Sequence, residues 1–192
     1  IPISEWKPEH FIENNSLLEG HENVKHCPSD EVINIVSNTT DIEFDIPIKP
    51  YEDAPKSNVN AYFGKGRVNQ RGFVQPRHWY EVEIIVPKPI TDNVNYPKAG
   101  YPETESIITV YTDDCWKFDC KISGTNSKNF RSCDDLKILG KWIKGRLENS
   151  GILEVGRPLT QDMLTAYGRN SIKMRGTKDP KIWYLDFSSR GE

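Results

Sequence analysis

Short runs in which apolar and polar side chains alternate constrain the fold of this chain more than any other feature. The runs YEVEIIV at 80–86 and WKFDCKI at 116–122 place an apolar residue at every second position. Because successive side chains of a β-strand point to opposite faces of its sheet, this alternation predicts strands with one buried face. The run SIITVYT at 106–112 predicts a third strand between them. No regular βαβ alternation is present, so the sequence predicts a mainly β, antiparallel domain.

Shorter apolar runs predict additional strands nearer the two ends of the chain. They lie at 32–36, 42–46, 59–63, 171–174 and 182–187, and the turn GTKDP joins the last two. Segments rich in Pro, Gly, Asn or Ser predict loops, and these lie at 91–103 and 124–132.

Two stretches have helical spacing. The longer one is expected to begin at Ser132 as N-cap and to end near Gly151, with Asp134 and Asp135 in its first turn. Its apolar positions recur three or four residues apart, at Leu136, Leu139, Ile143 and Leu147. The opposite face is expected to be solvated and carries Lys137, Lys141, Lys144 and Arg146. A short helix is predicted at 160–167, between Thr160 as cap and Gly168 as stop.

Charge is unevenly distributed along the chain, although the net charge is only −3. Residues 1–57 hold 12 acids and 4 bases, whereas residues 58–192 hold the remaining 16 acids and 21 bases. The first segment is therefore interpreted as an acidic linker or loosely docked appendage, and residues 58–192 as the β-rich domain. Because the chain begins with Ile, it is interpreted as the C-terminal piece of a larger protein.

Cysteine usage and hydropathy indicate a reduced, intracellular protein. The four cysteines, Cys27, Cys115, Cys120 and Cys133, are not expected to form disulfides in a chain of this length without a secretory signal. Structural zinc sites usually combine two closely spaced cysteine pairs, which are absent, so neither a metal nor another cofactor is expected. No run approaches the length of a membrane span.

Motifs for hydrolytic chemistry are weak. The four histidines do not form an H-x-K-x-x-x-x-D, H-E-x-x-H or similar pattern. A faint similarity to metal-dependent nucleases remains in Asp113, Asp114, Asp119 and Lys121, which leaves such a nuclease as an alternative function. The favoured interpretation is that Asp113 and Asp114 make a hairpin turn, so that the chain is a binding module without catalytic residues.

Two basic, amide-rich loops point to nucleic acid as the partner. The segment GKGRVNQRGFVQPRHW at 64–79 carries basic side chains and no acid, and KISGTNSKNFRS at 121–132 is similar in composition. Arginine, asparagine and glutamine match the hydrogen-bonding edges of guanine and adenine, while lysine and arginine also hold phosphates. Glycines in the first loop permit close approach to a duplex, and Phe73 and Trp79 are expected to anchor that loop to the sheet.

The sequence also resembles a known family, the C-terminal DNA-recognition domains of phospholipase-D-type restriction endonucleases of the BfiI and NgoFVII type. The similarity runs from about Val59 to Ser188 and is carried by ILGKWIKGRLE at 138–148, DMLTAYGRNSIKM at 162–174 and IWYLDFS at 182–188. VNAYFGKGRVNQRG resembles the first recognition arm of that family, and YTDDCWKFDCKISGTNSKNF resembles the strand that leads into its second arm. These domains are similar to plant B3 domains and to the effector domain of EcoRII.

The resemblance implies an open, seven-stranded β pseudobarrel with two α-helices and two arms that clamp the major groove of double-stranded DNA. It implies a restriction endonuclease of the bacterial cytoplasm whose separate N-terminal nuclease domain cuts DNA, so that this chain binds without cutting and is a monomer. The DNA-binding residues carried over are Lys65, Arg67, Asn69, Gln70, Arg71, Gln75, Arg77 and His78 in the first arm, and Lys121, Thr125, Asn126, Ser127, Lys128, Asn129 and Arg131 in the second. A third possibility is a protein-interaction domain whose basic loops meet an acidic partner.

Overall fold

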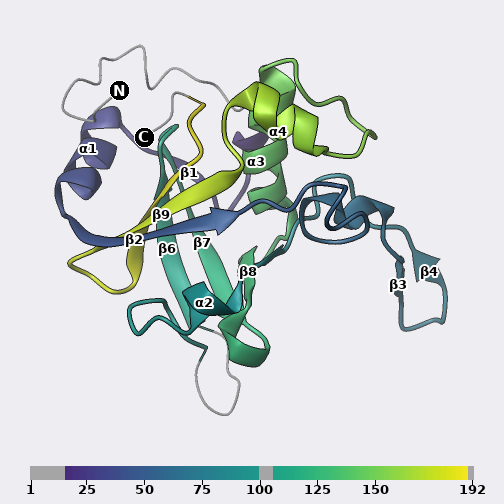
Figure 1. Ribbon diagram of the computed structural model, residues 1–192, viewed down its shortest axis with the longest axis horizontal. Coiled ribbons are helices and arrows are strands. Elements are labelled where there is room, and N and C mark those ends of the chain that lie inside the picture. The colour runs from purple at the N-terminus through teal and green to yellow at the C-terminus, as the bar shows by residue number, and fades with distance from the viewer. Residues whose placement is uncertain (1–15, 100–105, 190–192) are drawn as a thin grey trace.

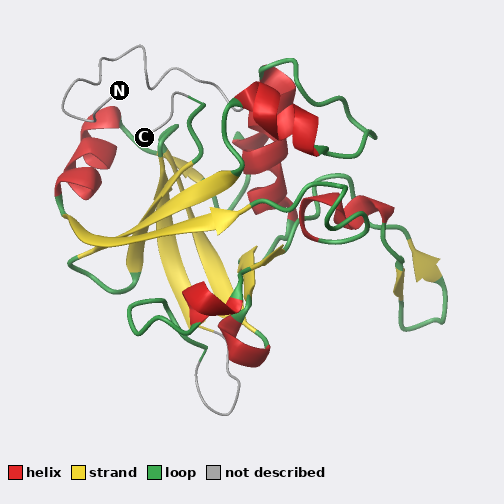
Figure 2. Ribbon diagram, viewed as in Figure 1, coloured by secondary structure: helices red, strands yellow, loops and turns green. Residues whose placement is uncertain are grey.

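The computed structural model describes residues 16–99 and 106–189, which form one curled β-sheet with helices at its ends (Figures 1 and 2). Seven strands follow one another in the order β2-β9-β10-β6-β7-β8-β5, and β1 is added by pairing with β7. The strands are β1 (Lys25–His26), β2 (Thr39–Pro47), β5 (Ile84–Ile85), β6 (Ser106–Thr112), β7 (Trp116–Ser123), β8 (Asn129–Ser132), β9 (Ser171–Thr177) and β10 (Ile182–Asp186). The sheet is not closed between β2 and β5, which confirms the predicted open, mainly β pseudobarrel.

Neighbouring strands of this sheet are antiparallel with one exception. Strand β10 runs parallel to β6, with Trp183 opposite Val110 and Tyr184 opposite Tyr111. Parallel neighbours require a long crossover connection, and here the chain between β6 and β10 supplies it with two helices and three other strands. The prediction of antiparallel pairing is therefore wrong at the centre of the sheet.

The described residues contain four α-helices, two of which were predicted. They are α1 (Ser29–Ser37), α2 (Lys88–Thr91), α3 (Lys137–Asn149) and α4 (Gln161–Tyr167), with short 3-10 helices η3 (Ser16–Leu18), η4 (Asn58–Phe63) and η5 (Thr125–Ser127). Helix α4 begins and ends as its sequence indicates. The Thr160 side chain accepts a hydrogen bond from the backbone N–H of Met163, and Gly168 ends the helix with a φ of 95°.

Two predicted strands are helical in the structure. The run at 32–36 belongs to α1, where Val32 and Val36 lie one helical turn apart and both are buried. The run at 59–63 belongs to η4, in which Asn60 departs from helical backbone angles and is held from outside the segment. Its buried side chain exchanges two hydrogen bonds with the backbone of Leu159, 99 residues away in sequence.

The start of α3 also differs from prediction. The helix begins at Lys137 rather than directly after Ser132. The hydroxyl of Ser132 donates to the carbonyl of Asp135 and accepts from the N–H of Leu139, while Asp135 accepts from the N–H of Lys137. The N-cap position is therefore Leu136, preceded by the turn at Asp135, and Ser132 belongs to β8, within a segment predicted to be a loop.

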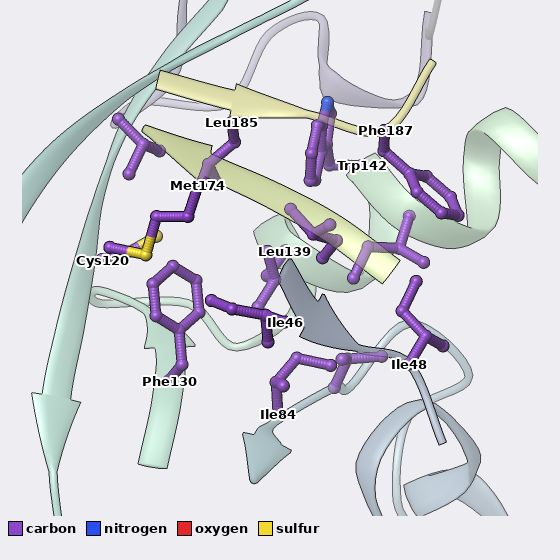
Figure 3. Close-up of a cluster of buried hydrophobic side chains, with 14 of the residues drawn as sticks. Ile46, Ile48, Ile84, Cys120, Phe130, Leu139, Trp142, Met174, Leu185 and Phe187 are labelled. Atoms are coloured by element: carbon purple, nitrogen blue, oxygen red, sulfur yellow. The ribbon is translucent and has the colours of Figure 1, made fainter. Parts of the chain in front are cut away.

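Helix α3 buries its apolar side chains in the main core. Trp142 and Leu139 of this helix contact a cluster that includes Met174 and Leu185 from the sheet (Figure 3). The expectation that Lys144 and Arg146 are solvated is wrong, because both side chains are buried. Arg146 compensates its burial by donating two hydrogen bonds to the carboxylate of Asp113, at 2.5 and 2.7 Å.

The acidic N-terminal segment contributes directly to the sheet. Strand β2 is an edge strand that pairs with β9, and Phe44 and Ile46 are buried in the main core. Helix α1 and Cys27 belong to a second buried cluster with Tyr111 and Tyr184. At least residues 39–47 are thus integrated rather than loosely docked. In the part of the chain that the structure describes, no helix has the length and apolar character needed to cross a membrane.

Candidate nucleic-acid interface

The first arm, residues 64–78, is a β-hairpin that projects from the barrel (Figure 1). Its strands β3 (Arg67–Val68) and β4 (Val74–Gln75) form a separate two-stranded sheet. Asn69 shapes the turn, because its side-chain oxygen accepts hydrogen bonds from the N–H groups of Arg71 and Phe73. Gly72 has a φ of 83°, a conformation that costs glycine little. The arm is therefore a defined ribbon.

Glu81 holds the foot of this ribbon. One of its carboxylate oxygens lies 2.5 Å from a terminal guanidinium nitrogen of Arg67 and 2.7 Å from one of Arg77. Arg77 also donates from Nε to the carbonyl of Lys65. Arg67 and Arg77 therefore both have partners at the foot of the arm. Sequence reasoning did not assign a role to Glu81, although it is the first acid after a stretch without any.

A buried polar cluster fixes the foot to helix α3. The indole N–H of Trp79 donates to Glu148, and the backbone carbonyl of Trp79 accepts from the buried ammonium of Lys144. This ammonium lies 3.7 Å from the centre of a Trp79 ring, a cation–π contact. Burial lowers the pKa of Lys144 to about 7, against the opposing effect of the Glu148 carboxylate. Trp79 anchors the arm as expected.

Phe73, the other predicted anchor, is instead exposed at the tip of the arm. Four polar side chains of the arm that were predicted to contact DNA are also exposed, and they are Lys65, Gln70, Arg71 and Gln75. His78 is exposed too, but its Nδ1 accepts from the N–H of Tyr80, and burial lowers the pKa of its ring. The structure thus divides the predicted residues into those bonded within the foot and those that face solvent, which lie at the turn (Gln70, Arg71) and nearer the foot (Lys65, Gln75).

The second arm, residues 124–128, is the tight turn between β7 and β8. Gly124, Asn126 and Ser127 all have positive φ angles, which is uncommon for the last two residue types. Ser127 is buried, and its hydroxyl accepts a hydrogen bond from the N–H of Ala99. Ser127 therefore positions the turn against the chain that follows α2. Thr125, Asn126 and Lys128 are exposed.

The remaining predicted residues of the second arm lie on strands. Lys121 of β7 and Arg131 of β8 are neighbours in register, and both are partly exposed. Arg131 lies 3.7 Å from the carboxylate of Glu83. The side chain of Asn129 packs against Gly124, where any Cβ would collide with it.

Both arms flank the edge strand β5. The first arm leads into Ile84, the first residue of this strand, while the second arm leads into Asn129, which pairs with Ile85 at its end. The N–H of Val86 donates to the carbonyl of Lys128, which joins the second arm directly to the chain after β5. The fold thus sets the two loops at opposite ends of one edge of the sheet, although they are some 50 residues apart in sequence.

The acids of the alternative nuclease site have different environments. Asp113 and Asp114 are buried, where Asp113 binds Arg146 and Asp114 accepts from the indole N–H of Trp142. Asp119 is exposed on β7 and accepts from the hydroxyl of Thr109. Across residues 16–99 and 106–189, no group of three or more His, Cys, Asp or Glu side chains is arranged to hold a metal ion. The buried pair is thus occupied with structural contacts.

The open pseudobarrel with two arms at one edge defines a B3-like DNA-binding domain. The sequence model of the NgoFVII C-terminal B3-like DNA-binding domain matches residues 34–178, and the chain belongs to that family. This match confirms the resemblance inferred from the sequence and identifies DNA as the partner. It begins within the acidic segment and includes strand β2, in agreement with the place of β2 in the sheet. Comparison with curated proteins gave no match.

Proposed function

We propose that this chain is the target-recognition domain of a restriction endonuclease and binds a specific sequence of double-stranded DNA. In this proposal both arms enter the major groove, and a nuclease domain elsewhere in the full-length protein, in the bacterial cytoplasm, cuts the DNA. The membership of the B3-like family supports DNA binding. The restriction context and the major groove are our extension of that finding.

The observation that carries the proposal is the projecting two-stranded ribbon of the first arm, which exposes polar side chains at and near its turn. A major groove admits a two-stranded β-ribbon, and arginine or glutamine side chains can then form paired hydrogen bonds with guanine or adenine edges. The turn of the first arm presents Gln70 and Arg71 for such contacts, while the exposed side chains of Lys65 and Gln75 lie nearer its foot. A prearranged foot lowers the entropy lost when these side chains bind.

We further propose a division of roles among the predicted residues. Gln70, Arg71 and Asn126 are assigned to base edges, and Lys65, Lys128, Lys121 and Arg131 to phosphates, together with Gln75, which lies on the face of the ribbon opposite Val68 and Val74. Arg67, Asn69, Arg77 and Ser127 are assigned to positioning, since each has a structural partner within the chain. Thr125, His78 and Asn129 are expected at the periphery of the contact.

Selection of binding duplexes from a random library tests this function. The protein should enrich one sequence, and its affinity for that sequence should fall steeply as salt concentration rises. Arg71→Ala should weaken binding to the selected duplex by about 1–3 kcal/mol and relax specificity at one base pair. Lys128→Ala should weaken binding to all duplexes alike and flatten the salt dependence.

A matched control is Arg157→Ala, because Arg157 is an exposed arginine in the loop between α3 and α4. It should leave both affinity and specificity unchanged. Failure to enrich any sequence, or an affinity that does not respond to salt, would contradict the proposal. The restriction context requires a further result, namely that the full-length protein cuts DNA at or near the selected sequence.

A further inference from the structure

The first arm exposes an apolar face. Val68 and Val74 are directly opposite each other in the pairing of β3 with β4, so their side chains lie on the same face of the ribbon. They are 68% and 66% exposed, and Phe73 at the end of the turn is 67% exposed. The opposite face carries Arg67 and Gln75, and Arg67 is directed to Glu81 at the foot. The valine face therefore points away from these polar contacts and into solvent.

An exposed apolar face on a projecting hairpin is a candidate binding surface. An isolated two-stranded hairpin is only marginally stable in water, and exposed apolar clusters on soluble proteins often mark binding sites. The charges around the valines restrict the choice of partner. Lys65 and Arg71 are exposed on the same arm, whereas its nearest acid, Glu81, is engaged at the foot. A partner that combines negative charge with a small apolar group fits this surface.

We infer that the paired side chains of Val68 and Val74 contact the C5-methyl group of thymine, so that the first arm recognises thymine by apolar contact as well as other bases by hydrogen bonds. The inference rests on the proposed function. The thymine methyl is the apolar group that base edges present in the major groove, and phosphates on either side supply the negative charge. The recognition sequence then contains at least one thymine that faces the valines.

Replacement of single thymines by deoxyuridine tests this inference, since uracil differs from thymine only by that methyl group. The duplex selected by the protein is prepared with one thymine replaced at a time, and its dissociation constant is measured by fluorescence anisotropy at fixed salt. At one or two positions the replacement should weaken binding about fourfold, as expected for one buried methyl group. At the other positions it should have no effect.

Variants then link this loss to the valines. Val68→Ala should reduce the preference for thymine over uracil at the sensitive position, because it removes two methyl groups from the contact, whereas Val68→Thr keeps one of these groups and a β-branched residue in the strand and should retain part of the preference. Val155→Ala is the matched control, because Val155 is also 66% exposed but lies in the loop between α3 and α4. This control should retain the fourfold preference for thymine. Circular dichroism confirms that each variant is folded.

The possible failures are distinct. If the protein binds its selected duplex but tolerates uracil at every position, the valine inference is overturned and the proposed function stands. If Val68→Ala weakens all duplexes equally and keeps the thymine preference, the valines only shape the arm, and the inference is again overturned. Self-association that Val68→Ala abolishes would assign the face to a second copy of the chain. Absence of any salt-dependent DNA binding would overturn the proposed function itself.

Discussion

Arg146 and Asp113 form an ion pair inside the core, where neither charge can be hydrated. The side chains of both residues are at least 95% buried, and the N–H of Phe187 lies 3.4 Å from the same carboxylate. Burial of two charges is compensated only when their mutual geometry is good. The pair therefore contributes mainly through what its disruption would leave behind, a buried guanidinium next to Trp142 whose remaining carboxylate is Asp114, 3.6 Å away.

Asp113→Ala should consequently lower the free energy of unfolding by about 3–5 kcal/mol. Urea denaturation followed by tryptophan fluorescence measures this loss. The double variant Asp113→Leu with Arg146→Met should regain part of it, because it removes both charges of the pair together, while Asp114, whose pKa burial raises to about 6, can take up a proton in place of its lost cation. A loss below about 1 kcal/mol in Asp113→Ala would contradict the burial argument. The stability measurement also matters for the alternative function as a nuclease. If Asp113→Ala abolished DNA cleavage, the loss would reflect unfolding of the protein and would not identify Asp113 as a catalytic residue.

Lys144 gives the fold a dependence on pH. Its pKa is lowered to about 7 by burial, whereas in the unfolded chain it has the ordinary value of 10.5. Between these values the unfolded state binds more protons, so stability rises with pH. Lys144→Met removes this contribution. Between pH 7 and 8.5 its unfolding free energy should therefore rise less steeply with pH than that of the unaltered protein, by up to about 1.4 kcal/mol per pH unit. Urea denaturation of both proteins at several pH values measures the difference, and parallel curves would refute the assignment.

At the scale of elements, the first arm depends on the conformation of its turn. Gly72→Ala adds a side chain at a φ of 83°, which should cost about 1 kcal/mol within the hairpin. Affinity for the selected duplex should fall about fivefold, while the melting temperature of the barrel stays constant. Gly156→Ala is a matched control, because Gly156 has a φ of 87° and equally open surroundings outside the arms. If Gly156→Ala lowered the affinity for DNA as much as Gly72→Ala, the loss would not come from the turn of the first arm.

Elements with a strong local pattern could be predicted from the sequence. Strands β6 and β7 were predicted to within one residue, because alternation specifies both the strand and its buried face. Helix α4 was predicted from its two caps. The helices α1 and η4 were mistaken for strands, because a run of five residues fits the period of a strand as well as that of a helix. In η4 the contact of Asn60 with Leu159 also forms only in the folded chain.

Contacts that form only in the folded chain also limited what the sequence could predict of the candidate nucleic-acid interface. The position and composition of the first arm were evident, but the separation between its foot and its tip was not. That separation depends on Glu81, which bonds two arginines only when the hairpin brings them together. The buried state of Ser127 similarly depends on the chain at Ala99. Whether any of these residues contacts DNA stays a prediction.

At the scale of the whole molecule, the acidic segment and the β domain are expected to fold together. The predicted boundary at residue 57 would separate β2 from β9, with which it pairs along its length. A fragment of residues 58–192 would lose Phe44, Ile46 and Ile48 from the core. It should therefore lack the cooperative thermal transition of residues 16–192, as measured by circular dichroism. A fragment 58–192 that melts cooperatively would support the boundary as predicted.

Gly140 of α3 lies so close to the carbonyl of Tyr80 that a Cβ at this position would collide with it. The chain leaving the first arm thus rests on the backbone of a core helix, and its direction does not depend on the side chains at the tip. We therefore expect that residues 68–74 can be replaced by another sequence while the barrel holds the first arm in the same orientation.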